Sequence, residues 1–259
     1  MLSYQHIYHA ANPADVHKHA VLAAMLDYLT RKEKPLSYLE THSGRGLYKL
    51  DTDEALKTGE AASGIDHYQP KLPTDHPYLR ALAQIRETHG PAAYPGSPLL
   101  ASTLLRKGDR LHLAELHPQE FEALSQVMEH KAKCHFEDGF AMAHKVCPPE
   151  PRRGLLLIDP SYEIKSDYET IPTKILKLHR KWNVGVIALW YPVLTSGAHI
   201  PMLGKLESAK LPGSLRHEIT FPPARDGHRM VGSGMFIVNA PYGLAEAAKP
   251  IEAAFSGLT

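Results

Sequence analysis

The chain has 259 residues, and 43% of them are hydrophobic, which suffices for one large core. Its formal net charge of +1 excludes the global basic field of many nucleic-acid-binding proteins. No apolar run reaches the roughly 20 residues of a membrane span, and the N-terminus has no signal-peptide core, so we expect a cytoplasmic protein that binds no membrane. Two cysteines and 17 dispersed histidines without ligand spacing do not support a disulfide framework, redox chemistry or a metal site.

A helix and a short strand are the first predicted elements. Asn12 is a helix N-cap, and Asp15 is placed to reach back to it as in a capping box. The apolar residues that follow repeat at helical spacing and predict a helix over 13–33. A strand over 36–40 comes next and runs directly into the glycine-containing segment Glu40–Gly46.

The stretch 49–95 interrupts this alternation of strand and helix. Its apolar pattern weakens, and glycine and proline turn signals separate short helical stretches such as 78–89. We therefore expect an inserted helical subdomain over 49–95, with the main domain formed by 1–48 and 96–259.

Strands and helices alternate again after the insertion. We expect strands at 110–115, 134–137, 154–159, 184–190, 215–221 and 234–239, and helices at 97–106, 118–130, 167–182, 201–207 and from 244 onwards. The alternation implies right-handed crossovers and a mainly parallel sheet covered on both faces. Only a loop joins the last two strands, so they are expected to pair antiparallel. The predicted fold class is α/β, with a doubly wound, mainly parallel seven-stranded sheet and an antiparallel edge hairpin.

The most informative motif is Asp159-Pro160-Ser161-Tyr162, which follows the apolar run 154–158. The run predicts a buried strand that delivers the acid and the ring to its carboxyl end, where open α/β sheets keep their chemistry. A hydrogen-bond acceptor beside an aromatic side chain suits a flat nitrogenous ring: the acceptor binds the exocyclic amine of the ring, and the aromatic side chain stacks on its face. The motif is similar to the D-P-P-Y motif of S-adenosylmethionine-dependent amino methyltransferases. An ordinary strand-to-loop exit is the alternative interpretation.

Glycines and acids end the neighbouring strands as well. Gly44 and Gly46 follow the first strand, where glycine lets a ligand approach the backbone. The full G-x-G-x-x-G fingerprint is absent, which disfavours a pyrophosphate. Glu115 ends the next strand and can accept both hydroxyls of a ribose, and Asp138-Gly139 follows the third, where a carboxylate can accept from an adenine amine. Together these residues indicate a nucleoside cofactor without phosphates, S-adenosylmethionine.

Further segments occur in a specific order along the chain. They are Met1-Leu2-Ser3-Tyr4-Gln5-His6, Ala14-Asp15-Val16-His17-Lys18-His19, Tyr94-Pro95-Gly96-Ser97-Pro98, Glu115-Leu116-His117-Pro118, Leu189-Trp190-Tyr191-Pro192, and Arg229-Met230 with Ser233-Gly234-Met235. Over essentially the whole chain they closely resemble the bacterial RlmJ family of 23S ribosomal RNA adenine-N6 methyltransferases. Two positions depart from the family pattern: Ser161 replaces the second proline of D-P-P-Y, and Val231-Gly232 stands where Thr-Ala is expected. Loss of the proline removes one fixed φ from the loop that positions Tyr162.

The resemblance implies a Rossmann-like class I methyltransferase that uses S-adenosylmethionine and no metal. The implied reaction is N6-methylation of one adenine in 23S ribosomal RNA, adenine 2030 in the family, with S-adenosylhomocysteine as the product. It also implies contacts to the cofactor from Lys18, His19, His42 and Ser97 at the methionine end, from Glu115 at the ribose, and from Asp138 with Gly139 at the adenine. We expect a monomer whose partner is 23S ribosomal RNA.

The resemblance assigns the acceptor side too. Asp159 and the Pro160 carbonyl would accept from the target amine, Tyr162 would stack on the base, and Tyr4 with His6 would close over it. Tyr4 and His6 can alternatively pack the chain terminus against the core, and Trp190 is expected to pack at the rim. The same chemistry on DNA adenine or on a protein glutamine, and a catalytically silent RNA-binding protein, stay open as alternatives.

Overall fold

The computed structural model describes residues 6–223, 227 and 229–257. Its centre is a seven-stranded sheet with strand order β5-β4-β1-β6-β7-β9-β8. The strands are β1 (Ser37–Glu40), β4 (Arg110–Ala114), β5 (Lys133–His135), β6 (Gly154–Ile158), β7 (Val186–Leu194), β8 (Leu215–Thr220) and β9 (Met230–Val238). Strands β5, β4, β1, β6 and β7 pair in parallel, and β9 pairs antiparallel with both β7 and β8. The predicted α/β fold with an antiparallel hairpin is confirmed.

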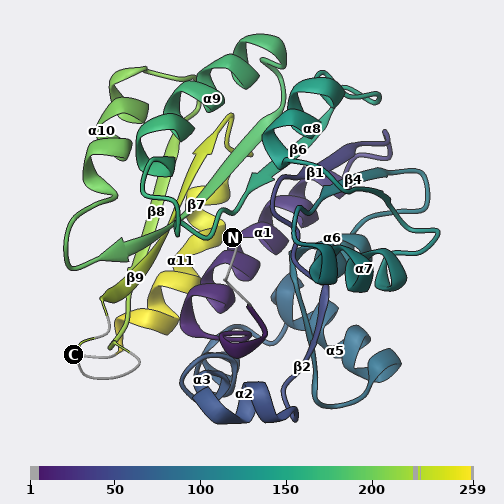
Figure 1. Cartoon of the computed structure of the whole chain (residues 1–259), viewed down its shortest axis with the longest axis vertical. Coiled ribbons are helices and arrows are strands. Elements are labelled where there is room, and N and C mark those ends of the chain that lie inside the picture. The colour runs from purple at the N-terminus through teal and green to yellow at the C-terminus, as the bar shows by residue number, and fades with distance from the viewer. Residues whose placement is uncertain (1–5, 224–226, 228, 258–259) are drawn as a thin grey trace.

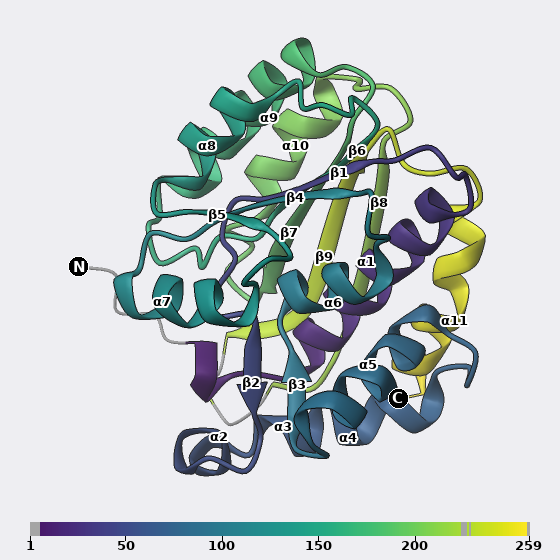
Figure 2. The ribbon, with the colours of Figure 1, turned by 90° about the vertical axis from the view of Figure 1, so that its right-hand side faces the viewer.

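Helices cover both faces of the sheet (Figures 1 and 2). They are α1 (Pro13–Thr30), α6 (Ser97–Leu104), α7 (Pro118–Val127), α8 (Gly139–Val146), α9 (Asp167–Lys181), α10 (Ile200–Ser208) and α11 (Leu244–Ser256). The apolar run of β6 shows why both faces need cover: alternate side chains point to opposite faces, so Leu155 and Leu157 pack with α1 and α11, whereas Leu156 and Ile158 pack with α8, α9 and α10. No helix in the described part of the chain is long and apolar enough to cross a bilayer.

The expected insertion contains α2 (Asp53–Thr58), α3 (Glu60–Ser63), α4 (Ile65–Tyr68), a 3₁₀ turn (Gln69–Lys71) and α5 (Pro77–His89). A two-stranded antiparallel ribbon that the sequence did not predict, β2 (Leu47–Lys49) and β3 (Ala93–Pro95), frames these helices. Their apolar side chains join the same core cluster as α1, and the ring of Tyr68 stacks on that of Phe255 in α11 with centroids 3.8 Å apart. The insertion therefore shares the core of the main sheet.

Several boundaries differ from the sequence-based expectation. Helix α1 ends at Thr30, because the carbonyls of Thr30, Lys32 and Lys34 accept from the Arg106 guanidinium in place of helical N–H groups. Strand β7 continues to Leu194 and β9 already begins at Met230, since these two ends pair with each other. Helix α8 was not predicted at all.

The parallel strands end at one edge of the sheet, and β1 lies between β4 and β6. Strand order therefore runs outwards in both directions from β1. Open α/β sheets bind their ligands in the crevice at such a point, outside the carboxyl ends of the strands.

Candidate functional site

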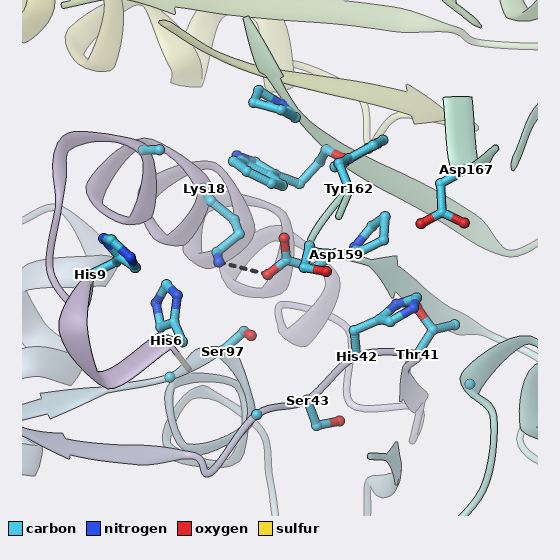
Figure 3. Close-up of a pocket in the computed structure, with 18 of the residues that line it drawn as sticks. His6, His9, Lys18, Thr41, His42, Ser43, Ser97, Asp159, Tyr162 and Asp167 are labelled. Carbon is cyan, nitrogen blue, oxygen red and sulfur yellow. Dashed lines mark hydrogen bonds and ion pairs between the residues drawn. The ribbon is translucent and has the colours of Figure 1, made fainter. Parts of the chain in front are cut away.

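A cavity of about 700 Å³ opens at this carboxyl edge (Figure 3). It collects side chains from the ends of the central strands, from α1, and from the N-terminal 3₁₀ turn η1 (His6–Tyr8). The expected site residues on its wall are His6, Lys18, His19, His42, Gly44, Ser97, Glu115, Asp138, Gly139, Asp159, Pro160 and Tyr162. Tyr4 lies outside the described residues, and Gly46 does not line the cavity.

Gly46 lies at a turn of the chain, outside the cavity lining. Gly46 has a positive φ of 77°, and its carbonyl accepts from the amide of Gly96 at 2.8 Å, so it turns the chain into the β2–β3 ribbon. Gly44, with φ of 59°, does line the cavity, and a Cβ added there would lie 2.7 Å from the Tyr48 hydroxyl.

A buried ion pair lies beside the 159–162 loop. The ammonium of Lys18 lies 2.6 Å from Asp159 Oδ2 and 3.1 Å from Asp15 Oδ1 (Figure 3). Burial alone would lower the pKa of Lys18, but the two carboxylates raise it above its ordinary value. Burial likewise opposes ionisation of Asp15, and His6 with Lys18 overcomes it, holding the pKa of Asp15 well below its ordinary value. Lys18, expected to bind the cofactor, thus already has two carboxylate partners within the protein.

Asp15 also fastens the N-terminal turn. The Asp15 amide donates to the Asn12 side chain at 2.9 Å, as expected for an N-cap. In a capping box the Asp15 carboxylate would accept from the Asn12 amide, but here it accepts from the Ala11 amide at 3.0 Å. The same carboxylate, already paired with Lys18, also lies 2.8 Å from His6 Nε2. The His6 ring meets Tyr48 edge-on with centroids 5.2 Å apart, which places η1 over one side of the cavity.

Tyr162 is held in an uncommon conformation. Its φ is +56°, a left-handed value that costs a residue with a Cβ about 1–2 kcal/mol. The phenol hydroxyl donates to the Trp190 carbonyl at 2.8 Å, and the ring stacks on Tyr168 with centroids 4.5 Å apart. Only 8% of the residue is exposed, and burial raises the pKa of Tyr162 well above its ordinary value. These contacts fix the ring although Ser161 replaces the expected proline.

The opposite side of the cavity is built around Glu115. Its Oε2 accepts from the Gly44 amide at 2.8 Å and its Oε1 from the His117 amide at 2.7 Å, and burial raises the pKa of Glu115. The carboxylate accepts up to about four hydrogen bonds, so it retains capacity for a ligand hydroxyl. Asp138 caps α8 by accepting from the Ala141 amide at 2.8 Å. Gly139 permits this start of α8, because a Cβ there would lie 1.8 Å from the Thr41 carbonyl oxygen.

Ser97 and His42 also line the wall. Ser97 donates to the buried carboxyl of Glu40, which also accepts from the Tyr38 hydroxyl, and burial raises the pKa of Glu40 to about 8. His42 Nδ1 lies 2.7 Å from Thr41 Oγ1, and burial lowers the pKa of His42 to about 4. His42 is therefore neutral near pH 7.

Some polar atoms of the wall have no partner among the described residues. They are His19 Nε2, Ser43 Oγ and His117 Nδ1, and each is buried. His19 Nδ1 lies 3.1 Å from the Tyr94 hydroxyl, and burial lowers the pKa of His19 to about 3, so its ring is neutral. Burying a polar group without a hydrogen bond is costly, so these atoms fit a polar ligand that completes them. Within the described ranges, no group of three or more His, Cys, Asp or Glu residues is placed to hold a metal ion.

Sequence reasoning missed several residues of the wall. Phe140 belongs to the unpredicted α8; its ring meets His42 edge-on at 5.7 Å between centroids and lies 4.0 Å below the Lys174 ammonium. Asp138 followed by an apolar run was the available signal for that helix. Trp190, expected as rim packing, is half-buried and lines the cavity.

Known proteins resemble this chain over nearly its whole length. The family model described as "Ribosomal RNA large subunit methyltransferase D, RlmJ" matches residues 33–255. The chain is 38% identical to the ribosomal RNA large subunit methyltransferase J of Escherichia coli K12, over 95% of this chain and 90% of that protein. It is 39% identical to the protein of the same name from Haemophilus influenzae, over 97% and 92% of the two chains.

A solved structure agrees with these sequence matches. The crystal structure of a Legionella pneumophila protein superposes with a TM-score of 0.83 at 37% identity, covering 94% of this chain and 91% of that one. By sequence and by fold, the chain belongs to the RlmJ family of ribosomal RNA large subunit methyltransferases.

Proposed function

We propose that this protein transfers a methyl group from S-adenosylmethionine to the N6 amine of one adenine in 23S ribosomal RNA. One observation carries the proposal: the acceptor loop 159–162 lines the same cavity as the strand ends at Gly44 and Glu115. The proposed acceptor for the amine and the proposed cradle for the nucleoside thus face one cavity. Membership of the RlmJ family, whose members above are named as ribosomal RNA methyltransferases, supports RNA as the substrate.

The cavity wall fits the cofactor in three parts. Glu115 would accept from the ribose hydroxyls, since both of its oxygens are already oriented by backbone amides. Asp138, with Gly139 beside it, would accept from the adenine amine. The polar atoms of His19, His42, Ser97 and Lys18 would receive the methionine carboxylate and amine, and His19 Nε2 is the buried atom that most needs such a partner.

S-adenosylmethionine supplies a methyl carbon bound to a positively charged sulfur. The adenine N6 is a weak nucleophile because its lone pair is delocalised into the ring. Hydrogen bonds from its two N–H groups to Asp159 and the Pro160 carbonyl would favour a tetrahedral nitrogen and stabilise its developing positive charge. The nitrogen lone pair would form the new bond to carbon while the carbon–sulfur pair returns to sulfur, and the proton lost from nitrogen would pass to solvent water.

The acceptor base must leave its stack to reach this loop. Extrusion costs a few kcal/mol, which an aromatic contact with Tyr162 would partly offset. The N-terminal turn, docked through His6 on Asp15, would then close the cavity over the base. Exclusion of water strengthens the hydrogen bonds that act on the amine.

The test uses 23S ribosomal RNA from a strain that lacks this protein. Incubation with the purified protein and S-adenosylmethionine should create N6-methyladenine at one position, adenine 2030 if the family target holds, detected by mass spectrometry of RNA fragments. Methylation of DNA or of a glutamine peptide in place of the RNA would establish one of the alternative substrates. Absence of both methyl transfer and calorimetric S-adenosylmethionine binding would leave a silent RNA-binding protein and overturn the proposal.

A further inference from the structure

A chain of buried polar side chains runs through the core behind the cavity. The indole N–H of Trp190 on β7 donates to Ser233 Oγ on β9 at 2.9 Å. Ser233 Oγ lies 2.8 Å from His17 Nδ1 on α1, and His17 Nε2 lies 2.8 Å from His217 Nδ1 on β8. Ser233 and His17 are fully buried and His217 is 4% exposed, so the middle of the chain lies in the core and joins four elements there.

Chemistry sets the direction of one hydrogen bond in this chain: an indole N–H can only donate, so the Ser233 hydroxyl accepts from Trp190. The tautomers of His17 and His217 set the directions of the other two bonds. At the far end of the chain, His217 Nε2 lies 3.2 Å from the Glu252 carboxylate. Ser233 thus ties the Trp190 indole to a buried pair of histidines, and this restrains the plane of the Trp190 ring.

The Trp190 end of the network lies beside the 159–162 loop of the cavity. The Lys18 ammonium, which pairs with Asp159, lies 5.6 Å from the centroid of the Trp190 ring. The Trp190 carbonyl accepts from the Tyr162 hydroxyl, and the two rings are tilted with centroids 6.1 Å apart. One residue therefore borders both the carboxylate and the phenol of the acceptor loop.

Tyr162 alone offers an incoming base little surface, because it is 8% exposed and already stacked on Tyr168. Trp190 is half-buried, lines the cavity and carries the larger ring. We propose that Trp190 is a second aromatic wall for the acceptor base, and that Ser233 and His17 are positioning residues that hold its indole. This assignment rests on the proposed methylation of RNA.

Two substitutions at Trp190 and one at Ser233 test the assignment, each with the RNA that the wild-type protein methylates. Trp190→Ala should lower kcat/KM for RNA about 10- to 100-fold, since base–aromatic stacking contributes that much. Trp190→Phe keeps a ring and should lose about 3- to 10-fold, and Ser233→Ala should raise the KM for RNA by a similar factor through the freed indole. All three should bind S-adenosylmethionine within about twofold of wild type, a split that general misfolding would not produce.

Trp182 provides the matched control. It is the other tryptophan of the chain, is fully buried, and donates from its indole to the Arg152 carbonyl at 2.6 Å at the amino end of the sheet. Trp182→Phe should leave the KM for RNA unchanged.

The same variant has Trp190 as its sole tryptophan, so fluorescence of this variant with S-adenosylhomocysteine reports on Trp190 alone. RNA with the target adenine should quench the emission, and the same RNA with an abasic target should not.

The outcomes separate the two proposals. If the wild-type protein methylates RNA and both Trp190 variants keep the KM of Trp182→Phe, the role of Trp190 is overturned and the proposed function stands. Equal quenching by adenine and abasic RNA also overturns it. A wild-type protein that methylates no ribosomal RNA removes the proposed function itself, and the role of Trp190 with it.

Discussion

Replacement of Asp159 by alanine probes the acceptor loop most directly. The change removes one of the two oxygens proposed to accept from the target amine and retains the Pro160 carbonyl. Removing one preorganised hydrogen-bonding group that acts on transition-state charge typically costs about 100- to 1,000-fold in kcat, so we expect a loss of that size. The dissociation constant for S-adenosylmethionine should change by no more than a few fold, because Glu115 and Gly44 are untouched.

The same change has a calculable effect on stability. Lys18 is 6% exposed and loses the partner at 2.6 Å, but keeps Asp15 at 3.1 Å. Breaking a buried ion pair outright costs about 3–5 kcal/mol, and the retained carboxylate should reduce this to about 1–3 kcal/mol. For a chain of this length the melting temperature should fall by roughly 2–8 °C.

Three measurements complete the experiment: single-turnover methylation at saturating RNA, calorimetry with S-adenosylmethionine, and thermal unfolding. Asp167→Asn is the matched control, since Asp167 lines the same cavity from α9, beyond Tyr162 as seen from Lys18 (Figure 3). It should retain most of its turnover. Wild-type kcat in Asp159→Ala, or equal losses of turnover and cofactor binding, would refute the acceptor role.

Other perturbations follow from the wall of the cavity. Glu115→Gln should weaken S-adenosylmethionine binding about 10- to 100-fold by calorimetry, because a ligand hydroxyl loses a charged acceptor; unchanged affinity would exclude the ribose contact. His6→Ala and Tyr4→Ala should lower turnover while cofactor affinity stays within about twofold, and unaltered turnover would count against closure by the N-terminus. Burial raises the pKa of Glu40 from 4.5 to about 8, so the folded protein holds a proton that the unfolded chain has released, and this contribution to stability is lost as pH rises through 8. His19 and His42 have lowered pKa values, so their contribution makes the protein more stable as pH rises, but only below about pH 6.5. The free energy of unfolding measured with urea should therefore fall by about 1–2 kcal/mol between pH 6.5 and 8. Glu40→Gln should abolish this fall. An equally steep fall in that variant would assign the effect to another group.

The sequence predicted the sheet and most of the cavity wall because both depend on local patterns. The run 154–158 is apolar throughout, as a strand covered on both faces must be, and the acid and tyrosine after it follow at the strand end. Glu115 and Asp138 were found in the same way, since each ends or follows a strand of the parallel sheet. Parallel strands bring such ends to one edge, so a list of strand ends already lists neighbours in space.

Contacts between distant segments could not be predicted in this way. The Lys18–Asp159 pair joins residues 141 positions apart, and nothing in the helix pattern around Lys18 specifies a carboxylate partner. Ser233 and Trp190 likewise meet only because β9 inserts between β7 and β8. The turn at Gly46 could not be told from a ligand contact either, because a glycine required by a turn and one required by a ligand look alike in sequence.

The stacking of Tyr68 on Phe255 has a consequence for how the molecule opens. One ring belongs to the insertion and the other to the last helix, and both rings lie in the cluster that includes α1. Segments that share a core in this way open as one cooperative unit. Amide protons of α4 and α11 should therefore exchange with deuterium together, at the slow rate of the central strands, and excising 49–95 should unfold the remainder instead of releasing a separable module.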